Sequence, residues 1–352
     1  QSRITGQSGI SHLTPEYIRQ TIKDYIGSKR NDKFWEVAFY GGSFTAIHTE
    51  LQHQLLAPAS EMLKSGIIDG IRCSTRPDAV GDEAISLLQS YGVNTVELGV
   101  QSMNDGILVD AKRGHTAQEV VDAVARLKRR GMVVGVQLLP GLKGETWATI
   151  LETAIAVVEL KPDFVRIYPV LVIENTELAD QYRAGAYKPL STEQAITYCA
   201  FLKEWFESHN IEVIRTGLQS TDELDSGDSL LAGPYEPAMG ELVVNEQFKQ
   251  RIERCFDEHF SESALGDQYT YNFSPLSNHY SYKDKCRTHA NNTDRLMKHR
   301  IVISYPRSLT SKVRGLKNRN ILYFQEAYPQ FNIEWCEDST RNTVRCCIDG
   351  LQ

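Results

Sequence analysis

The chain has 352 residues, of which 41% are hydrophobic and 24% are charged, and its formal net charge is -7. This composition is typical of a globular protein, and the length allows one large domain with a smaller one. No apolar run approaches the roughly 20 residues that a membrane span requires, and none of the seven cysteines has CxxC spacing. We therefore expect a protein of the reducing cytoplasm without a membrane partner, a zinc site or a disulfide scaffold.

Short apolar runs alternate with amphipathic helical stretches over the first two thirds of the chain. The predicted strands are 36–40, 67–73, 94–100, 132–139, 163–168 and 211–216. Helix starts are marked by Thr14 before Pro15, and by possible capping boxes at Thr116 and Ser191. Alternating strands and helices predict parallel strands joined by crossover helices. Since no doubly wound glycine fingerprint is present, the pattern favours an α/β fold with a partial (β/α) TIM-type barrel.

The alternation stops between residues 225 and 245, where turn-forming residues are frequent. We place the domain boundary near residue 245, which gives a barrel over 1–245 and a small α+β domain over 246–352. In the second domain, 299–306 is predicted as a strand, and two short helices and two further strands are predicted to follow. Residues 279–330 hold 11 Lys and Arg against 3 Asp and Glu, a balance of +8. This basic segment predicts a local site for a polyanion.

The sequence Gly315-Leu316-Lys317-Asn318 lies between the two predicted helices of the tail. It resembles the GxxG loop of KH domains, which clamps a nucleic-acid backbone. The predicted RNA-binding residues around this loop are Lys312, Arg314, Gly315, Lys317, Asn318 and Arg319. Tyrosines and basic residues of 279–295 are further candidates for base stacking. The alternative is a solvated basic face on a small structural domain.

Polar residues occupy the carboxyl ends of the predicted barrel strands, where barrel enzymes place their working residues. Glu97 and Gln101 are separated by an even number of residues on one strand, so strict alternation predicts that they face the same side. A ligand pocket and a self-satisfied polar plug both fit such residues. The polar strand-end residues are Gly41, Gly42, Ser43, Ser74, Thr75, Arg76, Glu97, Gln101, Gln137, Arg166, Tyr168, Arg215 and Gln219.

Six motifs in order, "AFYGGSFT", "STRPD", "VELGVQSMND", "RGHT", "QLLPGLKGET" and "KPDFVRIYPVLV", resemble the radical S-adenosylmethionine (SAM) superfamily. The nearest group is the one related to the catalytic subunit of Elongator, with a more distant likeness to oxygen-independent coproporphyrinogen oxidases. The resemblance implies a SAM site with the amino group at the glycine motif, the ribose and methionine carboxylate near the fourth-strand residues, and the adenine near the fifth. The implied residues are Tyr40, Gly41, Gly42, Ser43, Ser74, Thr75, Arg76, Glu97, Gln101, Gln137, Leu139, Pro140, Arg166 and Tyr168.

The resemblance also implies a 4Fe–4S cluster held by a CxxxCxxC loop, and this motif is absent from the sequence. We expect the cluster cysteines and the first strand upstream of Gln1, and we expect no metal ligand within the chain. An electron donor such as a flavodoxin or ferredoxin would be needed. His115 of "RGHT" has a family counterpart, but a structural role in its loop is the favoured alternative.

The predicted function is a radical SAM enzyme that modifies RNA, either tRNA or ribosomal RNA. Elongator relatives use an acetyltransferase domain on tRNA uridine, and nothing after residue 245 resembles one. Two alternatives stay open: a radical SAM enzyme for a small molecule such as a porphyrin, and a catalytically inactive RNA-binding protein on the same scaffold.

Overall fold

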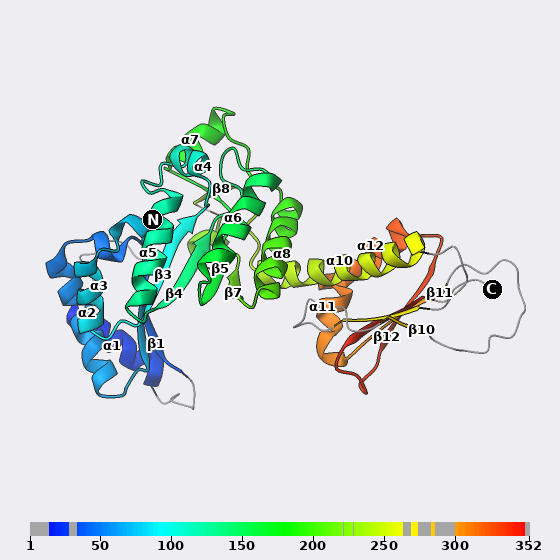
Figure 1. The fold of residues 1–352 in the computed structure, drawn as a ribbon, viewed down its shortest axis with the longest axis horizontal. Helices are drawn as coiled ribbons and strands as arrows, with labels where there is room; N and C mark the ends of the chain where they lie inside the picture. The colour runs from blue at the N-terminus through cyan, green and yellow to red at the C-terminus, as the bar shows by residue number, and fades with distance from the viewer. Residues whose placement is uncertain are drawn as a thin grey trace, which may run out of the picture. The chain divides into compact units, whose positions relative to one another are not determined.

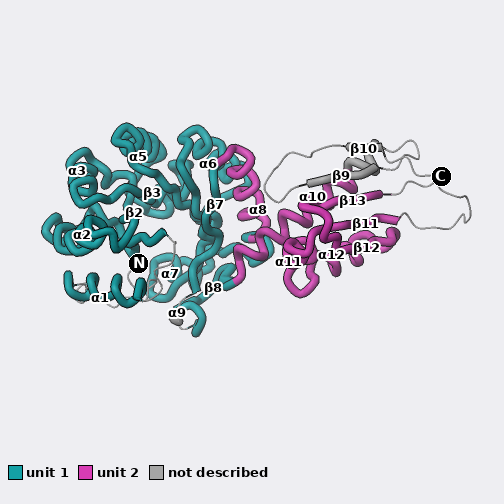
Figure 2. The backbone as a smooth tube through the Cα atoms, turned by 90° about the horizontal axis from the view of Figure 1, so that it is seen from below, with its two compact units in different colours: residues 1–195, 211–237 teal, residues 196–210, 238–352 magenta. Residues whose placement is uncertain are grey.

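The computed structural model describes residues 14–27, 34–220, 222–227, 229–262, 269–273, 283–285 and 300–348. The chain forms two compact units (Figure 2). Unit 1 holds residues 1–195 and 211–237, and unit 2 holds 196–210 and 238–352. The turn-forming stretch ends at Pro237, and helix α10 (Met239–Glu262) begins directly after it. Residue 245, the boundary expected from the sequence, therefore lies inside this helix.

Unit 1 is built on six parallel strands that form a curled half-barrel (Figure 1). Their order in the sheet follows the chain, β1-β2-β3-β4-β5-β7, as crossover helices between neighbouring parallel strands require. The predicted α/β fold with a partial barrel is confirmed. The strands are β1 (Glu36–Phe39), β2 (Gly70–Thr75), β3 (Thr95–Gln101), β4 (Val133–Leu138), β5 (Phe164–Ile167) and β7 (Glu212–Thr216).

The helices of unit 1 begin where the sequence predicts. The Thr14 side chain accepts a hydrogen bond from the first turn of α1, and Thr116 forms a capping box with Glu119. Ser191 and Gln194 exchange the same pair of hydrogen bonds before α8. The helices are α1 (Pro15–Ile26), α2 (Thr49–Lys64), α3 (Asp82–Ser90), α4 (Asp105–Asp110), α5 (Ala117–Arg129), α6 (Trp147–Leu160), α7 (Glu177–Arg183), α8 (Thr192–Ser208), which continues into unit 2, and α9 (Asp222–Asp225).

Apolar side chains of the strands and helices form the core of unit 1. Leu56 of α2, Ile71 of β2, Ile85 and Leu88 of α3, and Leu98 of β3 are fully buried. A two-stranded antiparallel ribbon, β6 (Val172–Ile173) with β8 (Leu230–Ala232), belongs to the same unit. Because outward-facing residues pack against the helices, the alternate residues of each strand point into the half-barrel.

Unit 2 contains a mixed five-stranded sheet in the order β10-β9-β13-β11-β12. Strands β11 and β12 are parallel and are joined by α11 and α12, while β13 runs antiparallel to β11. The predicted small α+β domain is thus present. Its elements after α10 are β9 (Tyr269–Phe273), β10 (Lys283–Lys285), β11 (Arg300–Tyr305), α11 (Thr310–Arg314), α12 (Arg319–Ala327), β12 (Asn332–Glu337) and β13 (Val344–Ile348).

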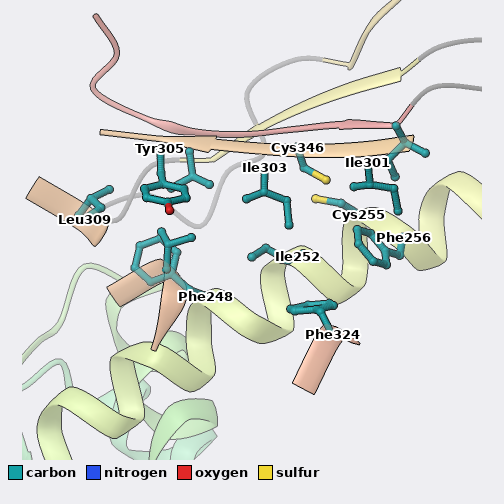
Figure 3. Packing of buried hydrophobic residues seen from close by; sticks show 13 residues of the cluster. Phe248, Ile252, Cys255, Phe256, Ile301, Ile303, Tyr305, Leu309, Phe324 and Cys346 are labelled. Atoms are coloured by element: carbon teal, nitrogen blue, oxygen red, sulfur yellow. The ribbon is translucent and has the colours of Figure 1, made fainter. Parts of the chain in front are cut away.

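One face of this sheet packs on α10 (Figure 3). Phe248 and Ile252 of α10 point toward Tyr305 and Ile303 of β11, while the ring of Phe256 lies 5.4 Å from that of Phe324, and these side chains are all buried. The helix is therefore part of the core of unit 2. The segment 279–295, proposed for base stacking, lies outside the described residues except for β10.

Candidate functional sites

The carboxylate of Glu97 is the centre of a polar network inside the half-barrel. Its side chain is fully buried. Oε1 accepts hydrogen bonds from Tyr40 OH at 2.6 Å and Arg72 Nη1 at 2.9 Å. Oε2 accepts from Gln137 Nε2 at 2.9 Å and pairs with Arg166 Nε at 2.9 Å. Strands β2 to β5 and the loop after β1 therefore meet at one carboxylate, and Glu97 is a positioning residue with both oxygens occupied.

Gly135 of β4 makes room for this network. A Cβ on Gly135 would lie 2.3 Å from a ring carbon of Phe164 and 3.1 Å from Cγ of Glu97. Protein interiors do not tolerate a contact of 2.3 Å, so any larger residue would displace the ring. The glycine in the middle of a central strand, which otherwise weakens a sheet, is explained by this close approach.

The network keeps its phenols neutral and its guanidinium groups charged. Burial and the neighbouring Glu97 raise the pKa of Tyr40, and burial likewise raises the pKa of Tyr168. Burial alone would lower the pKa of Arg72. The hydrogen bonds to Glu36 and Glu97 outweigh this effect, so the pKa of Arg72 is raised above its ordinary value. None of these groups changes its protonation near neutral pH. The residues can bind and orient a ligand, and they are poorly suited to general acid–base chemistry.

Gln101 reaches the site by a different geometry from the predicted one. The pairing of β3 with β4 shifts between Leu98 and Gln101, which inserts one residue as a bulge. Gln101 itself adopts a left-handed backbone with φ of 71°. Strict alternation does not hold across a bulge, so the shared side of Glu97 and Gln101 stays a prediction. Gln101 is buried, and its Oε1 has no hydrogen-bond partner, which marks it as a candidate ligand contact.

Arg113 is a candidate that the sequence prediction missed. Its Nη2 lies 3.6 Å from the position that a Cβ on Gly99 would take, and Nε2 of Gln101 lies 2.7 Å from the same point. The buried Nε of Arg113 has no partner. Burial, and then the like charge of Arg76, lower the pKa of Arg113. The half-buried guanidinium is suited to an anionic group of a ligand, and the unpaired amide oxygen of Gln101 is suited to a hydrogen-bond donor on the same ligand.

The remaining residue of "RGHT" has a structural contact. His115 is buried and its Nε2 lies 3.2 Å from the carbonyl oxygen of Val100, while its Nδ1 has no partner. Burial lowers the pKa of His115, so the ring is neutral at pH 7. Arg76, predicted in the same region, forms an ion pair with Asp78 and is partly exposed. It lies beside Arg113 rather than in the Glu97 network.

The glycine motif after β1 lies at the same edge of the sheet. Gly41 has φ of 108°, which favours glycine, and the Gly42 carbonyl lies 3.5 Å from Ser74 Oγ. A Cβ on Gly42 would meet no protein atom within 4 Å. Ser43 begins the following turn through a hydrogen bond from Ala46 N. Open space at Gly42 is therefore available to a ligand.

The other predicted strand-end residues are held by backbone and side-chain bonds. Leu139 N donates to Gln101 O at 3.0 Å, and Pro140 O accepts from Val170 N at 2.9 Å. Thr75 Oγ1 lies 2.5 Å from Thr45 Oγ1. The structure thus gathers the predicted strand-end residues at one edge of the half-barrel. Two groups form there: the Glu97 network, with Tyr168 bonded to Arg166 at 3.2 Å, and a second group around Gln101.

The predicted RNA-binding loop of unit 2 connects α11 to α12. Lys312, Lys317 and Asn318 are exposed, Arg314 and Arg319 are half-buried, and Gly315 is buried. Gly315 has φ of 78°, and a Cβ on it would lie 3.0 Å from Asn320 N. Lys317 and Asn318 both adopt left-handed backbone conformations. The loop therefore has a defined shape with lysines on its outside.

Two buried asparagines fix this loop. Asn245 of α10 donates to the carbonyl oxygens of Ser311 and Lys312 at 3.1 and 3.2 Å, and accepts from Leu316 N at 2.9 Å. Asn320 donates to the carbonyl oxygens of Asn245 and Val313 at 2.9 and 3.0 Å. Sequence reasoning missed both residues, because a single asparagine on a helix carries no local signal for such a role.

Within the described ranges, no group of three His, Cys, Asp or Glu side chains could hold a metal ion. None of the described helices combines the length and the apolar character needed to cross a bilayer.

The chain is similar to several known proteins. A tRNA uridine(34) acetyltransferase of Methanocaldococcus jannaschii is 37% identical over 145 residues, which are 39% of this chain and 27% of that protein. An uncharacterized protein of the same organism is 31% identical over 193 residues, 53% of this chain and 59% of that protein. The structure of Elp3 from Methanocaldococcus infernus, lacking residues 1–46, has a TM-score of 0.60 with 24% identity, and the match covers 76% of this chain and 69% of that chain. The chain thus spans less than two thirds of the length of the two Methanocaldococcus jannaschii proteins.

Two family models match the chain. The model described as the radical SAM superfamily matches residues 2–156, and the radical SAM C-terminal domain matches 162–250. Together they cover more than half of the sequence, and the resemblance seen in the motifs is confirmed. Members of this family use SAM and a 4Fe–4S cluster. The chain belongs to the radical SAM superfamily and shares its half-barrel with the Elongator-related Elp3 proteins.

Proposed function

We propose that the protein is a radical SAM enzyme that modifies RNA in the cytoplasm, with tRNA as the favoured substrate and ribosomal RNA as the other candidate. The observation that supports it most is that one chain contains both a polar strand edge in a radical SAM half-barrel and, in unit 2, a loop that carries exposed lysines. The similarity to a protein named tRNA uridine(34) acetyltransferase favours tRNA.

The residues at the strand edge fit SAM. Backbone carbonyls at Gly41 and Gly42 would receive its amino group, because the space above Gly42 is open. Arg113 would pair with the SAM carboxylate, and the unpaired Oε1 of Gln101 would accept a hydrogen bond from an N–H or O–H group elsewhere on SAM. When bound next to a reduced cluster, SAM supplies a 5′-deoxyadenosyl radical. In this proposal the chain binds, orients and shields the cofactor, and a flavodoxin or ferredoxin supplies the electron.

Gly42→Ala tests the cofactor site without disturbing the fold. The new methyl group would meet no protein atom within 4 Å, so the melting temperature should stay within about 2 °C of the wild type. The methyl group would fill space assigned to SAM, so we expect SAM affinity to fall about tenfold or more. Equilibrium dialysis with radiolabelled SAM measures this.

Gly81→Ala is the matched control, because its Cβ would also enter open space at a helix start away from the strand edge. If the Gly42 variant kept the SAM affinity of the wild type, the glycine motif would not be part of the SAM site.

Charge reversal in the loop of unit 2 tests whether the protein binds RNA there. Lys312→Glu combined with Lys317→Glu reverses two exposed charges without altering the buried asparagines. We expect the affinity for unfractionated tRNA to fall about 10- to 100-fold at low salt, and the slope of log K against log salt to decrease by about 1.5 to 2 units. Filter binding across a salt series measures both quantities.

Lys64→Glu with Arg129→Glu is the control, because both residues lie in exposed last turns of unit 1 helices. If the two double variants bound tRNA equally well, the loop would be a solvated basic face and not an RNA-binding site. Mass spectrometry of RNA nucleosides from cells with and without the gene then tests the modification itself, and a missing nucleoside is the expected result.

A further inference from the structure

Two arginines lie side by side on the last two strands of the half-barrel. Arg166 of β5 pairs in register with Arg215 of β7. A register shift after Val165 produces this pairing, because Val165 pairs with Val213 and one residue, Ile214, is then passed over. Without the shift Arg166 would pair with Ile214, which is 38% exposed. Bulges beside functional sites commonly redirect a side chain, and this one brings a second guanidinium beside the Glu97 network.

The two guanidinium groups differ in what they contact. Arg166 pairs with Glu97, and its two terminal nitrogens donate to Tyr168 OH at 3.2 Å and Tyr40 OH at 3.1 Å. Among the described residues, Arg215 has one hydrogen-bond partner, the carbonyl oxygen of Gly217, which accepts from Nε at 3.2 Å. No described group accepts from its two terminal nitrogens, which can therefore donate to another group. Arg166 is a structural cation, and Arg215 has most of its donors available.

The described part of the chain offers no counterion to Arg215. Among the residues that the structure describes, no carboxylate lies within ion-pair distance of Arg215. The positive charge of Arg215 lowers the pKa of Tyr168, although burial, which raises that pKa, has the larger effect. A half-buried guanidinium with two available terminal nitrogens can bind an anion through two parallel hydrogen bonds. The site therefore has the chemistry of an oxyanion receptor.

If Arg113 holds the carboxylate of SAM, as proposed above, Arg215 is available for a different anion. The unpaired groups assigned to SAM, Gln101 and Arg113, lie at the end of β3, and three strand spacings, about 14 Å, separate β3 from β7. We propose that Arg215 forms a substrate subsite that binds a phosphate group, and, resting on the proposed function, that this is a backbone phosphate of the RNA next to the nucleotide being modified. Arg binds such a group through two parallel hydrogen bonds.

Binding of unfractionated tRNA and of SAM to the wild type, Arg215→Gln, Arg215→Lys and Arg129→Gln tests the proposal. For Arg215→Gln we expect about a tenfold or greater loss of tRNA affinity and a salt slope lower by about 0.7 to 0.9. Lysine keeps the charge, so Arg215→Lys should regain the salt slope. Arg129→Gln, at an exposed helix end, should match the wild type. If Arg215→Gln lost affinity only because it folds poorly, replacement by lysine would not be expected to bring the salt slope back to the wild-type value.

A second measurement identifies the source of the phosphate. Phenylglyoxal labels accessible arginines, and mass spectrometry locates the label. We expect Arg215 to be labelled, and tRNA and inorganic pyrophosphate to protect it while SAM does not. Protection by both supports the RNA phosphate, and protection by pyrophosphate with no tRNA binding to any variant would support a phosphorylated small molecule and reject RNA.

Several outcomes would overturn the subsite. The first is an Arg215→Gln variant whose tRNA affinity and salt slope equal those of the wild type. The second is an Arg215→Gln variant that loses SAM affinity to the same extent as tRNA affinity. The third is labelling of Arg215 that neither tRNA nor pyrophosphate reduces.

Discussion

Replacing Glu97 by alanine is expected to destabilise unit 1 by about 3 kcal/mol, because the half-buried guanidinium groups of Arg72 and Arg166 lose the buried carboxylate that they share, although Arg72 keeps Glu36. Tyr40 and Gln137 lose their acceptor at the same time. Denaturant unfolding followed by circular dichroism measures the effect. Glu97→Gln keeps the volume and one acceptor oxygen, so its loss of stability should be smaller than that of alanine.

The control for this prediction is an ion pair at the surface. Glu177 pairs with Lys112 at 2.5 Å, and both side chains are more than half exposed. Glu177→Ala should therefore change the free energy of unfolding by less than about 1 kcal/mol. If Glu97→Ala were as stable as this control and bound SAM normally, the buried carboxylate would not be what holds the strand edge together.

Replacing Asn245 by alanine is expected to lower the stability of unit 2 by about 2 to 4 kcal/mol. Three hydrogen bonds are lost, and the carbonyl groups of Ser311 and Lys312 and the amide of Leu316 each lose a partner. Thermal unfolding of the variant measures this. Affinity for tRNA should also fall, although no positive charge is removed, because the loop that presents Lys312 and Lys317 loses its support.

Asn342→Ala, at an exposed position in unit 2, is the control and should leave stability within about 0.5 kcal/mol of the wild type. Weak tRNA binding by Asn245→Ala at unchanged stability would mean that Asn245 contacts the RNA. Unchanged stability with unchanged binding would show that the loop is shaped without it.

The sequence is most informative where local pattern and global fold agree. Six apolar runs separated by amphipathic helices predict six parallel strands, because each run is bounded by turn and cap residues such as Thr116. The polar strand ends are also predictable, since a parallel sheet places all its carboxyl ends at one edge. Glu97 stands out because a charged residue in an apolar strand must have a partner.

Other parts of the site depend on contacts that no local pattern contains. The position of Gln101 follows from a bulge between two strands, and strand alternation cannot reveal a bulge. Arg113 lies 12 residues after Gln101 in the chain and approaches it only in the folded protein. Asn245 has the sequence signature of a solvent-facing helix residue, and its partners are about 70 residues away in the chain.

The consecutive left-handed residues Lys317 and Asn318 have a consequence for how the loop meets a partner. A lysine in this conformation is disfavoured by about 1 to 2 kcal/mol, so an unsupported loop would leave it. Here the asparagines stabilise the strained backbone before any partner arrives. Docking would then require little further ordering of the chain, and the speed of association would be set by how often the two molecules collide in a suitable orientation.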